Sequence, residues 1–261
     1  MPEGPEVTLM AESLKKFIKS KILNININHK RYKSRINLPY FKKKLPLIIK
    51  NITNKGKFLY IILEKGYSLG FTLGMTGHFW IPKVSREFKT LEGYVYDNKH
   101  NHIEIETTKG SFFFNDPRLF GHFYIFTQTK LQEKLDSLGP DILKDIPKMK
   151  QSDFNELFIK IKGQTIIADL LLNQKFISGI GNIYRCEAMY MAKIHPLRNV
   201  KSLTQNDKKL LKKYLVKATA DGYKTQKNKL HLYNLKIYGN KSASKIQRKG
   251  RTIWYDSKKQ T

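Results

Sequence analysis

In its second half the chain reads Leu172-Asn173-Gln174-Lys175-Phe176-Ile177-Ser178-Gly179-Ile180-Gly181-Asn182-Ile183-Tyr184-Arg185. Apolar residues at helical spacing precede this stretch, so we expect it to join one helix to another through a glycine-containing turn. The glycines allow a nucleic-acid backbone to come close, and the N-terminus of the second helix presents N–H groups that bind phosphate. The simpler alternative is an ordinary helix start capped by the Asn182 side chain.

The charge of the chain favours the phosphate-binding interpretation. Its 261 residues include 49 Lys and Arg against 21 Asp and Glu, a formal net charge of +28. Such an excess indicates a polyanionic partner, and nucleic acid is the default. We find no apolar stretch of membrane-spanning length and no signal peptide, so we expect no membrane partner and an intracellular location. The single cysteine, Cys186, excludes an internal disulfide and a zinc site built from several thiolates.

The spacing of apolar residues changes along the chain and predicts the α+β class, with an N-terminal antiparallel β-sandwich domain. Short runs rich in Ile, Tyr, Phe, Val and Thr, broken by Gly, Asn and Pro, extend from about residue 22 to 126. Helical spacing dominates from Leu131, and strand-like residues return from Leu235 to Tyr255. Expected strands include Lys57–Leu63, Ser68–Leu73, Tyr94–Asp97, His102–Thr107 and Ser111–Phe114. The expected domains are a β-sandwich over 1–130, a connector over 131–149, a helical domain over 150–234 and a β-hairpin over 235–261.

The N-terminal hexapeptide, Met1-Pro2-Glu3-Gly4-Pro5-Glu6, predicts a nucleophile beside an acid. Removal of Met1 would leave Pro2 with a secondary amine that titrates near pKa 8 and is partly neutral at physiological pH. Attack of this amine on a sugar carbon gives an iminium ion, which makes lyase chemistry available. Glu3 is placed to donate a proton, Glu6 lies one helical turn further along, and Gly4 is expected to keep the backbone accessible. The simpler alternative, a helix start, is compatible with this and predicts one apolar face, formed by Val7, Met10, Leu14 and Phe17.

Three loops carry side chains suited to DNA. Lys57 follows a turn glycine at the start of a buried strand, where a positioned cation can hold a phosphate. Two loops between predicted strands offer Met75, Arg118 and Phe120, which can fill the gap left by an extruded base. Each of these residues, taken singly, also has a simpler structural interpretation. Lys57 would be a solvated surface residue, Met75 and Phe120 would pack in the core, and Arg118 would form a surface ion pair.

Together these segments resemble the formamidopyrimidine-DNA glycosylase and endonuclease VIII family. The resemblance covers almost the whole chain, and several separated motifs in the family's order make it specific. The Gln174–Glu187 segment matches the family's helix-two-turns-helix element. The other matching segments are Met1–Glu6, Lys55–Leu59, Gly74–Gly77 and Asp116–Gly121.

The resemblance implies roles for individual residues. Pro2 would be the Schiff-base nucleophile, Glu3 the general acid, Glu6 a supporting residue of the catalytic pocket, and Lys57 a phosphate and sugar contact. The implied DNA-binding residues are Asn182, Gly181, Gln174 and Arg251. The implied void fillers are Met75, Arg118 and Phe120, and Leu119 stands where many members carry a second arginine.

The C-terminus departs from the family pattern. Many members have a four-cysteine zinc finger, but here Asp256 and Lys259 occupy the positions of the last two thiolates, and Gly239 and Ser242 align with the first two. The segment therefore resembles the zincless finger of animal Nei-like and plant enzymes, and we expect its β-hairpin to fold without metal. Arg251 matches the finger arginine that contacts phosphate.

The function expected from this resemblance is that of a bifunctional DNA glycosylase and abasic-site lyase that needs no cofactor and acts on damaged DNA as a monomer. Oxidised pyrimidines and formamidopyrimidines are favoured because the segment from Gly222 to Tyr238 is short, whereas Gly74–Gly77 looks more like the 8-oxoguanine branch. The location would be nuclear in a eukaryote and cytoplasmic otherwise. The alternatives are a non-catalytic helix-two-turns-helix protein that binds nucleic acid and a family-derived protein that binds abasic sites without turnover.

Overall fold

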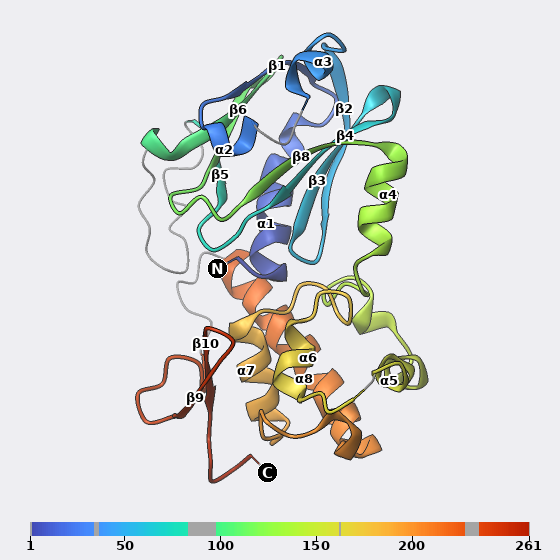
Figure 1. Ribbon diagram of the computed structural model, residues 1–261, viewed down its shortest axis with the longest axis vertical. Helices are drawn as coiled ribbons and strands as arrows, with labels where there is room; N and C mark the ends of the chain where they lie inside the picture. The colour runs from blue at the N-terminus through green and yellow to red at the C-terminus, as the bar shows by residue number, and fades with distance from the viewer. Residues whose placement is uncertain (1, 34–36, 83–97, 162, 228–234, 261) are drawn as a thin grey trace. The chain divides into compact units, whose positions relative to one another are not determined.

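The computed structural model describes residues 2–33, 37–82, 98–161, 163–227 and 235–260. The chain forms two compact units, shown in Figure 1. The first contains Pro2 and Val7–Asp136, and the second contains Glu3–Glu6 together with Ser137–Thr261. The break after Asp136 lies inside the connector expected over 131–149. Across the described ranges, no helix is both long and apolar enough to cross a membrane.

An eight-stranded antiparallel sheet forms most of the first unit, in the order β5-β7-β6-β1-β2-β3-β4-β8. Its strands are rich in β-branched and aromatic residues, which suit a pleated, half-buried surface. In β3 the burial alternates over most of the strand, as expected where one sheet face meets a core. The strands are β1 (Lys21–Ile27), β2 (Leu47–Lys55), β3 (Phe58–Leu63), β4 (Tyr67–Thr72), β5 (His78–Trp80), β6 (Asn101–Thr107), β7 (Gly110–Asn115) and β8 (His122–Thr127).

The two halves of this sheet face each other. They are joined where β1 pairs with β2, at Lys21↔Ile48 and Ile22↔Leu47. Phe71 of β4 has its ring centroid 4.9 Å from that of Phe79 in β5 and 5.4 Å from that of Phe114 in β7, although these strands are far from β4 in the sheet order. Aromatic side chains therefore fill the space between two layers, and the predicted α+β fold with a β-sandwich is confirmed.

Helices complete the first unit. The predicted apolar face of the N-terminal helix is buried as expected, at Val7, Met10, Leu14 and Phe17. The expected strands agree with β3, β4, β6 and β7 within a few residues, whereas Tyr94–Asp97 lies outside the described residues. The helices are α1 (Gly4–Leu14, which begins in the second unit), α2 (Lys30–Lys33), α3 (Leu38–Lys42) and α4 (Gln128–Asp136).

The second unit is helical and carries a two-stranded hairpin. As the sequence predicts, α6 and α7 are joined by the glycine-containing turn, and α7 begins at Asn182. The hairpin packs against the helical core through Ile253, which is fully buried. The elements are α5 (Gln151–Ile159), α6 (Ile167–Leu172), α7 (Asn182–Met191), α8 (Gln205–Lys227), β9 (Ser244–Arg248) and β10 (Arg251–Tyr255).

Candidate active site

The Glu3 carboxylate caps the N-terminus of α7. It accepts hydrogen bonds from the backbone N–H groups of Gly181 at 2.7 Å, Ile183 at 2.9 Å and Tyr184 at 3.4 Å, and Glu3 is 1% exposed. The N–H groups at a helix start carry partial positive charge and stabilise an anion. Gly181 occupies the N-cap position and no side chain of α7 caps the helix, so the alternative in which Asn182 caps it is wrong. The residue after Pro2 is thereby held in one orientation.

Glu6 supports Glu3 from within the same segment. Its carboxylate accepts a hydrogen bond from the Glu3 backbone N–H at 2.7 Å and another from the Tyr184 hydroxyl at 2.8 Å. The side-chain amide of Gln226 in α8 also donates to it. Gly222 of α8 makes room for this arrangement, because a Cβ there would overlap the Tyr184 hydroxyl. The helices α7 and α8 therefore set the position of the N-terminal carboxylates.

Gly4 has a role different from the expected one. Its N–H donates to the Gly179 carbonyl at 2.8 Å, and Gly4 is buried. A Cβ at Gly4 would lie 3.2 Å from the Gly179 Cα and carbonyl oxygen. The expectation that Gly4 keeps the backbone accessible is thus wrong: glycine is needed because the N-terminal segment and the turn approach closely.

Gln174 stabilises the turn before α7. Its side-chain Nε2 donates to the carbonyls of Leu172 and Ile180, both at 3.0 Å, and its Oε1 accepts from the Gly179 N–H at 2.9 Å. These contacts close the turn on itself. A direct DNA contact by Gln174 stays a prediction, and its visible role is to shape the loop whose N–H groups hold Glu3.

Asn182 links the start of α7 to the hairpin. Its Nδ2 donates to the Thr252 carbonyl at 2.8 Å, so the residue after Arg251 is tied to the helix-two-turns-helix element. Its Oδ1 accepts from Arg185 Nε at 2.9 Å and Nη2 at 2.6 Å. Arg185 is 1% exposed, and burial lowers the pKa of its guanidinium. The sequence contained Arg185 within the motif, but a buried cation that orients Asn182 follows only from the fold.

Lys57 lies in the turn between β2 and β3, in the first unit. Gly56 in this turn has φ +55°, which glycine adopts without strain. The buried Asn54 holds the turn, since its Nδ2 donates to the Gly56 carbonyl at 2.9 Å and to the Thr8 hydroxyl of α1 at 3.0 Å. Lys57 follows Gly56 in this turn and is half-buried. The hydrogen bond from Asn54 to the Gly56 carbonyl therefore fixes the backbone directly before Lys57. Asn54 was not predicted from the sequence.

The loops that carry Met75, Arg118 and Phe120 lie against each other. A Cβ at Gly74 would overlap the Phe120 backbone, and the Arg118 N–H donates to the Thr76 hydroxyl at 3.2 Å. The Arg118 guanidinium carbon lies 4.9 Å from the centroid of the Phe120 ring, and Phe120 is 48% exposed. The structure thus brings together loops that the sequence could not show to converge.

A buried carboxylate joins these two loops. Asp116 is 0% exposed and accepts from the Thr76 hydroxyl at 2.8 Å, the Tyr32 hydroxyl at 2.8 Å and the Gly121 N–H at 2.6 Å. Its carbonyl lies 3.1 Å from Nε2 of His102. Burial and the Asp116 charge raise the pKa of Tyr32, which therefore stays a neutral donor. Sequence reasoning placed Asp116 in a motif but gave it no role.

Leu119 has φ +57° and packs partly buried against the apolar core of the first unit. At the C-terminus, Lys259 Nζ lies 3.3 Å from Asp256 Oδ2, so two of the residues at thiolate positions form an ion pair. Gln260, 3% exposed, bonds to the Ile194 carbonyl at 2.8 Å and accepts from the Asp256 N–H at 2.7 Å. The hairpin end is therefore held by an ion pair and hydrogen bonds.

Comparison with known proteins identifies the family. The formamidopyrimidine-DNA glycosylase N-terminal domain matches residues 1–123, and the formamidopyrimidine-DNA glycosylase H2TH domain matches residues 138–234. The formamidopyrimidine-DNA glycosylase of Rickettsia conorii is 32% identical, over 98% of this chain and 97% of that protein. The corresponding Legionella pneumophila (strain Paris) protein is 30% identical, over 79% of this chain and 72% of its own.

Solved structures show the same fold. The Lactococcus lactis formamidopyrimidine-DNA glycosylase bound non-covalently to DNA containing an AP site superimposes with a TM-score of 0.81, at 22% identity over 99% of both chains. The wild-type Lactococcus lactis protein in complex with DNA containing N7-benzyl-Fapy-dG also gives 0.81, at 22% identity over 100% of both chains. Since 32% identity extends over nearly the full length of the Rickettsia conorii protein, this chain belongs to the formamidopyrimidine-DNA glycosylase family of DNA glycosylases.

Proposed function

We propose that the chain removes oxidised bases from DNA and then cleaves the strand through a Schiff base on Pro2. The observation that carries this proposal is the capping of α7 by Glu3, because it fixes the carboxylate of the residue that directly follows Pro2. A protein that only binds DNA has no need for a free N-terminal proline next to an oriented carboxylate.

The chemistry can be written with the chain's own groups. The Pro2 nitrogen attacks C1′ of the damaged nucleotide, and the base leaves with the electron pair of the glycosidic bond. The resulting ammonium loses its proton to the Glu3 carboxylate, which the N–H groups of α7 hold in place. Glu3 then gives this proton to O4′ as the C1′–O4′ bond opens and the iminium forms. Water next takes a C2′ proton, and the electron pair left behind expels the 3′ phosphate through the iminium. A second elimination, in which water takes a C4′ proton, expels the 5′ phosphate.

Each unit, taken by itself, offers candidate DNA contacts. Lys57, on a turn fixed by Asn54, supplies a cation for a phosphate beside the lesion. Arg251 and Asn182, joined through Thr252, supply a second phosphate-binding element. Exposed side chains on the paired loops, among them Phe120, would fill the space left by the flipped nucleotide. We expect damaged DNA to be bound by a monomer, without a metal or cofactor, inside the cell.

The length of one segment suggests which lesions are favoured. We propose oxidised pyrimidines and formamidopyrimidines as the favoured substrates because the segment between Gly222 and Tyr238 leaves little room for a long purine-covering loop. Part of that segment, 228–234, lies outside the described residues. Solved complexes of the Lactococcus lactis relative contain N7-benzyl-Fapy-dG and an oxidised pyrimidine. A panel of duplexes with one thymine glycol, one formamidopyrimidine or one 8-oxoguanine ranks the substrates directly.

Borohydride trapping tests the chemistry. The untagged protein is incubated with a duplex that has one abasic site, reduced, digested and mapped by mass spectrometry. An adduct on Pro2 is the expected result, and a variant that keeps Met1 should give none. Tight, salt-sensitive binding of the duplex without any adduct would instead support the non-catalytic alternatives.

A further inference from the structure

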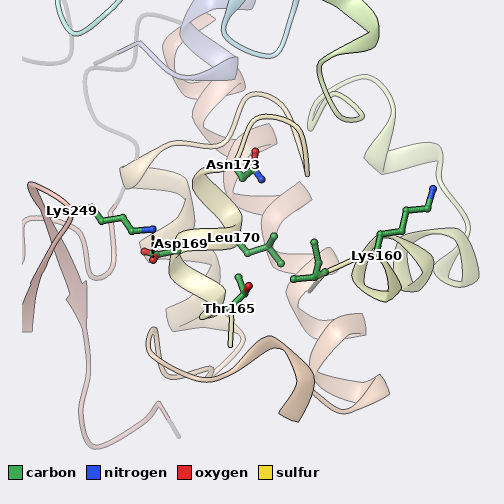
Figure 2. Close-up of a pocket in the computed structure, with 7 residues that line it drawn as sticks. Lys160, Thr165, Asp169, Leu170, Asn173 and Lys249 are labelled. Atoms are coloured by element: carbon green, nitrogen blue, oxygen red, sulfur yellow. Dashed lines mark ion pairs between the residues drawn. The ribbon is translucent and has the colours of Figure 1, made fainter. Parts of the chain in front are cut away.

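Asp169 of α6 pairs with two cations of the hairpin. Its carboxylate lies 3.1 Å from Arg248 Nε through each oxygen, 3.0 Å from Arg248 Nη2 and 2.8 Å from Lys249 Nζ. Figure 2 shows the Asp169 and Lys249 side chains directed toward each other. The Asp169 side chain is 13% exposed, whereas those of Arg248 and Lys249 are 40% and 71% exposed, so water screens the Lys249 pair more than the Arg248 pair. Burial by itself raises the pKa of the carboxyl, but hydrogen bonds from Arg248 and Lys249 outweigh burial and lower it.

These cations belong to the finger turn, which we define as Arg248–Arg251. Arg248 pairs with Arg251 across the hairpin, and Lys249 and Gly250 have φ +48° and +70°. Two positive φ values in a two-residue hairpin turn match the type I′ geometry that suits the twist of a hairpin. Glycine tolerates this conformation, whereas in a lysine the Cβ approaches the following carbonyl oxygen and strains the backbone. The ion pair with Asp169 therefore holds a turn that includes a strained residue.

Arg251 lies between two anchors. On the turn side, Asp169 holds Arg248 and Lys249, and on the strand side Asn182 Nδ2 donates to the Thr252 carbonyl. The segment beyond is fixed in the core by Ile253, which is fully buried. Residues of α6 and α7, which are distant in sequence from the hairpin, therefore determine the position of the Arg251 backbone.

We propose that Asp169 is a positioning residue, whose pairing with Arg248 and Lys249 holds the finger turn so that Arg251 can contact a DNA phosphate. This inference rests on the proposed function, because it assumes that Arg251 contacts damaged DNA. It adds a residue for which neither the family resemblance nor the sequence pattern indicated a role.

The direction in which Asp169→Asn changes DNA affinity distinguishes a positioning role from a purely electrostatic one. Asp169 is an anion beside a basic hairpin, so its negative charge by itself repels DNA. If charge were its only contribution, Asp169→Asn would tighten DNA binding. If the carboxylate positions the finger turn, the same substitution frees the turn and weakens binding at the lesion. The two explanations predict opposite changes.

The test compares Asp169→Asn with Glu156→Gln, a charge-matched control at an exposed position on α5. Dissociation constants are measured for a duplex with a tetrahydrofuran abasic analogue and for the same duplex undamaged. We expect Asp169→Asn to weaken binding of the analogue duplex about tenfold, the effect of losing roughly one charge-assisted contact. Binding of undamaged duplex should change little, and Glu156→Gln should leave both constants near wild type or slightly tighter.

A conservative variant adds a second readout. Asp169 lines a cavity of about 460 Å³ with Lys160, Thr165 and Asn173, which leaves space for a longer side chain. Asp169→Glu should therefore recover most of the affinity that Asp169→Asn loses. In strand cleavage, Asp169→Asn should raise KM and leave kcat near wild type, because the carboxylate does not touch the reacting atoms.

The outcomes are distinct. Equal or tighter binding of the analogue duplex by Asp169→Asn overturns the positioning role, as does failure of Asp169→Glu to recover affinity. Thermal unfolding checks that the variants fold, and Asp169→Ser replaces Asp169→Asn if the latter does not. The binding assay uses an uncleavable analogue, so it stands whether or not Pro2 forms an adduct. Absence of the adduct in wild type would remove the lyase proposal and leave the Asp169 result interpretable.

Discussion

At the level of single residues, Asp116 determines how the two loops with the proposed void fillers are joined. Its carboxylate accepts hydrogen bonds from Thr76 in one loop, Gly121 in the other and Tyr32 in α2. In Asp116→Asn an amide N–H₂ faces these donors, so we expect a loss of about 2 kcal/mol in the free energy of unfolding. Side chains that fill the gap left by a flipped nucleotide can stack on the base that remains opposite it. Loss of loop pairing should therefore also weaken any preference of the enzyme for that opposite base. Urea unfolding and cleavage assays with each opposite base measure both effects.

Tyr32→Phe is the matched control for Asp116, because it removes one donor and leaves the carboxylate with Thr76 and Gly121. We expect it to cost about 1 kcal/mol, with the opposite-base preference retained. An Asp116→Asn variant with wild-type stability and preference would contradict this account. The sequence could not have singled out Asp116, because a buried aspartate and an exposed one look alike until the partners of the carboxylate are known. The void-filling role of Arg118 and Phe120, which their chemistry and the family resemblance suggested, stays a prediction.

At the level of elements, α8 contributes to the N-terminal site through a glycine. Replacing a helical glycine by alanine normally stabilises a helix by about 0.5–1 kcal/mol. At Gly222 the new Cβ would overlap the Tyr184 hydroxyl, which donates to Glu6. We therefore expect Gly222→Ala to lower both stability and the yield of the Pro2 adduct, as measured by thermal unfolding and borohydride trapping.

A second substitution isolates the cause. Tyr184→Phe added to Gly222→Ala removes the overlapping hydroxyl, so stability should return toward wild type, while the hydrogen bond to Glu6 stays lost. Lys224→Ala, at an exposed position on α8, controls for helix propensity. If Gly222→Ala is as stable and as reactive as Lys224→Ala, the packing of Tyr184 does not position Glu6.

The elements themselves were largely predictable, and their connections were not. Alternating apolar residues in β3 and the glycines before α7 are local patterns, and both elements formed as predicted. The cap of α7 comes from Glu3, which lies 178 residues before Gly181 in the chain, and no local pattern encodes such a partner. The same holds for Asn54, whose turn-forming role depends on the distant Thr8. Local spacing thus predicts strands and helices, whereas the fixing of a site depends on tertiary contacts.

At the scale of the whole molecule, the two units should respond differently to acid. His78 and His102 are buried in the first unit, and burial lowers the pKa of both below the ordinary 6.5. The unfolded chain then binds protons near pH 6.5 that the folded unit does not bind, so stability is present above this pH and is lost as the pH falls. In the second unit, Asp169, Asp207 and Asp256 have a lowered pKa, and their contribution is lost only as the pH falls below 3.8.

Between pH 7 and 5, therefore, the first unit should lose stability while the second changes less. Peptide-resolved amide hydrogen exchange, corrected for the intrinsic exchange rate at each pH, measures the stability of both units in one sample. His78→Asn should reduce the acid sensitivity of the first unit, because the side chain no longer titrates while an amide N–H can still donate to the Thr76 carbonyl that His78 Nδ1 contacts at 3.0 Å. Parallel loss of protection in both units, or an unchanged response in His78→Asn, would show that carboxylates and not the buried histidines govern acid stability. Thr76, whose carbonyl lies beside His78, also donates its hydroxyl to Asp116, the residue that joins the paired loops. Protonation of His78 should therefore disturb these loops first. We expect the preference for the base opposite the lesion to decline in acid before strand cleavage does.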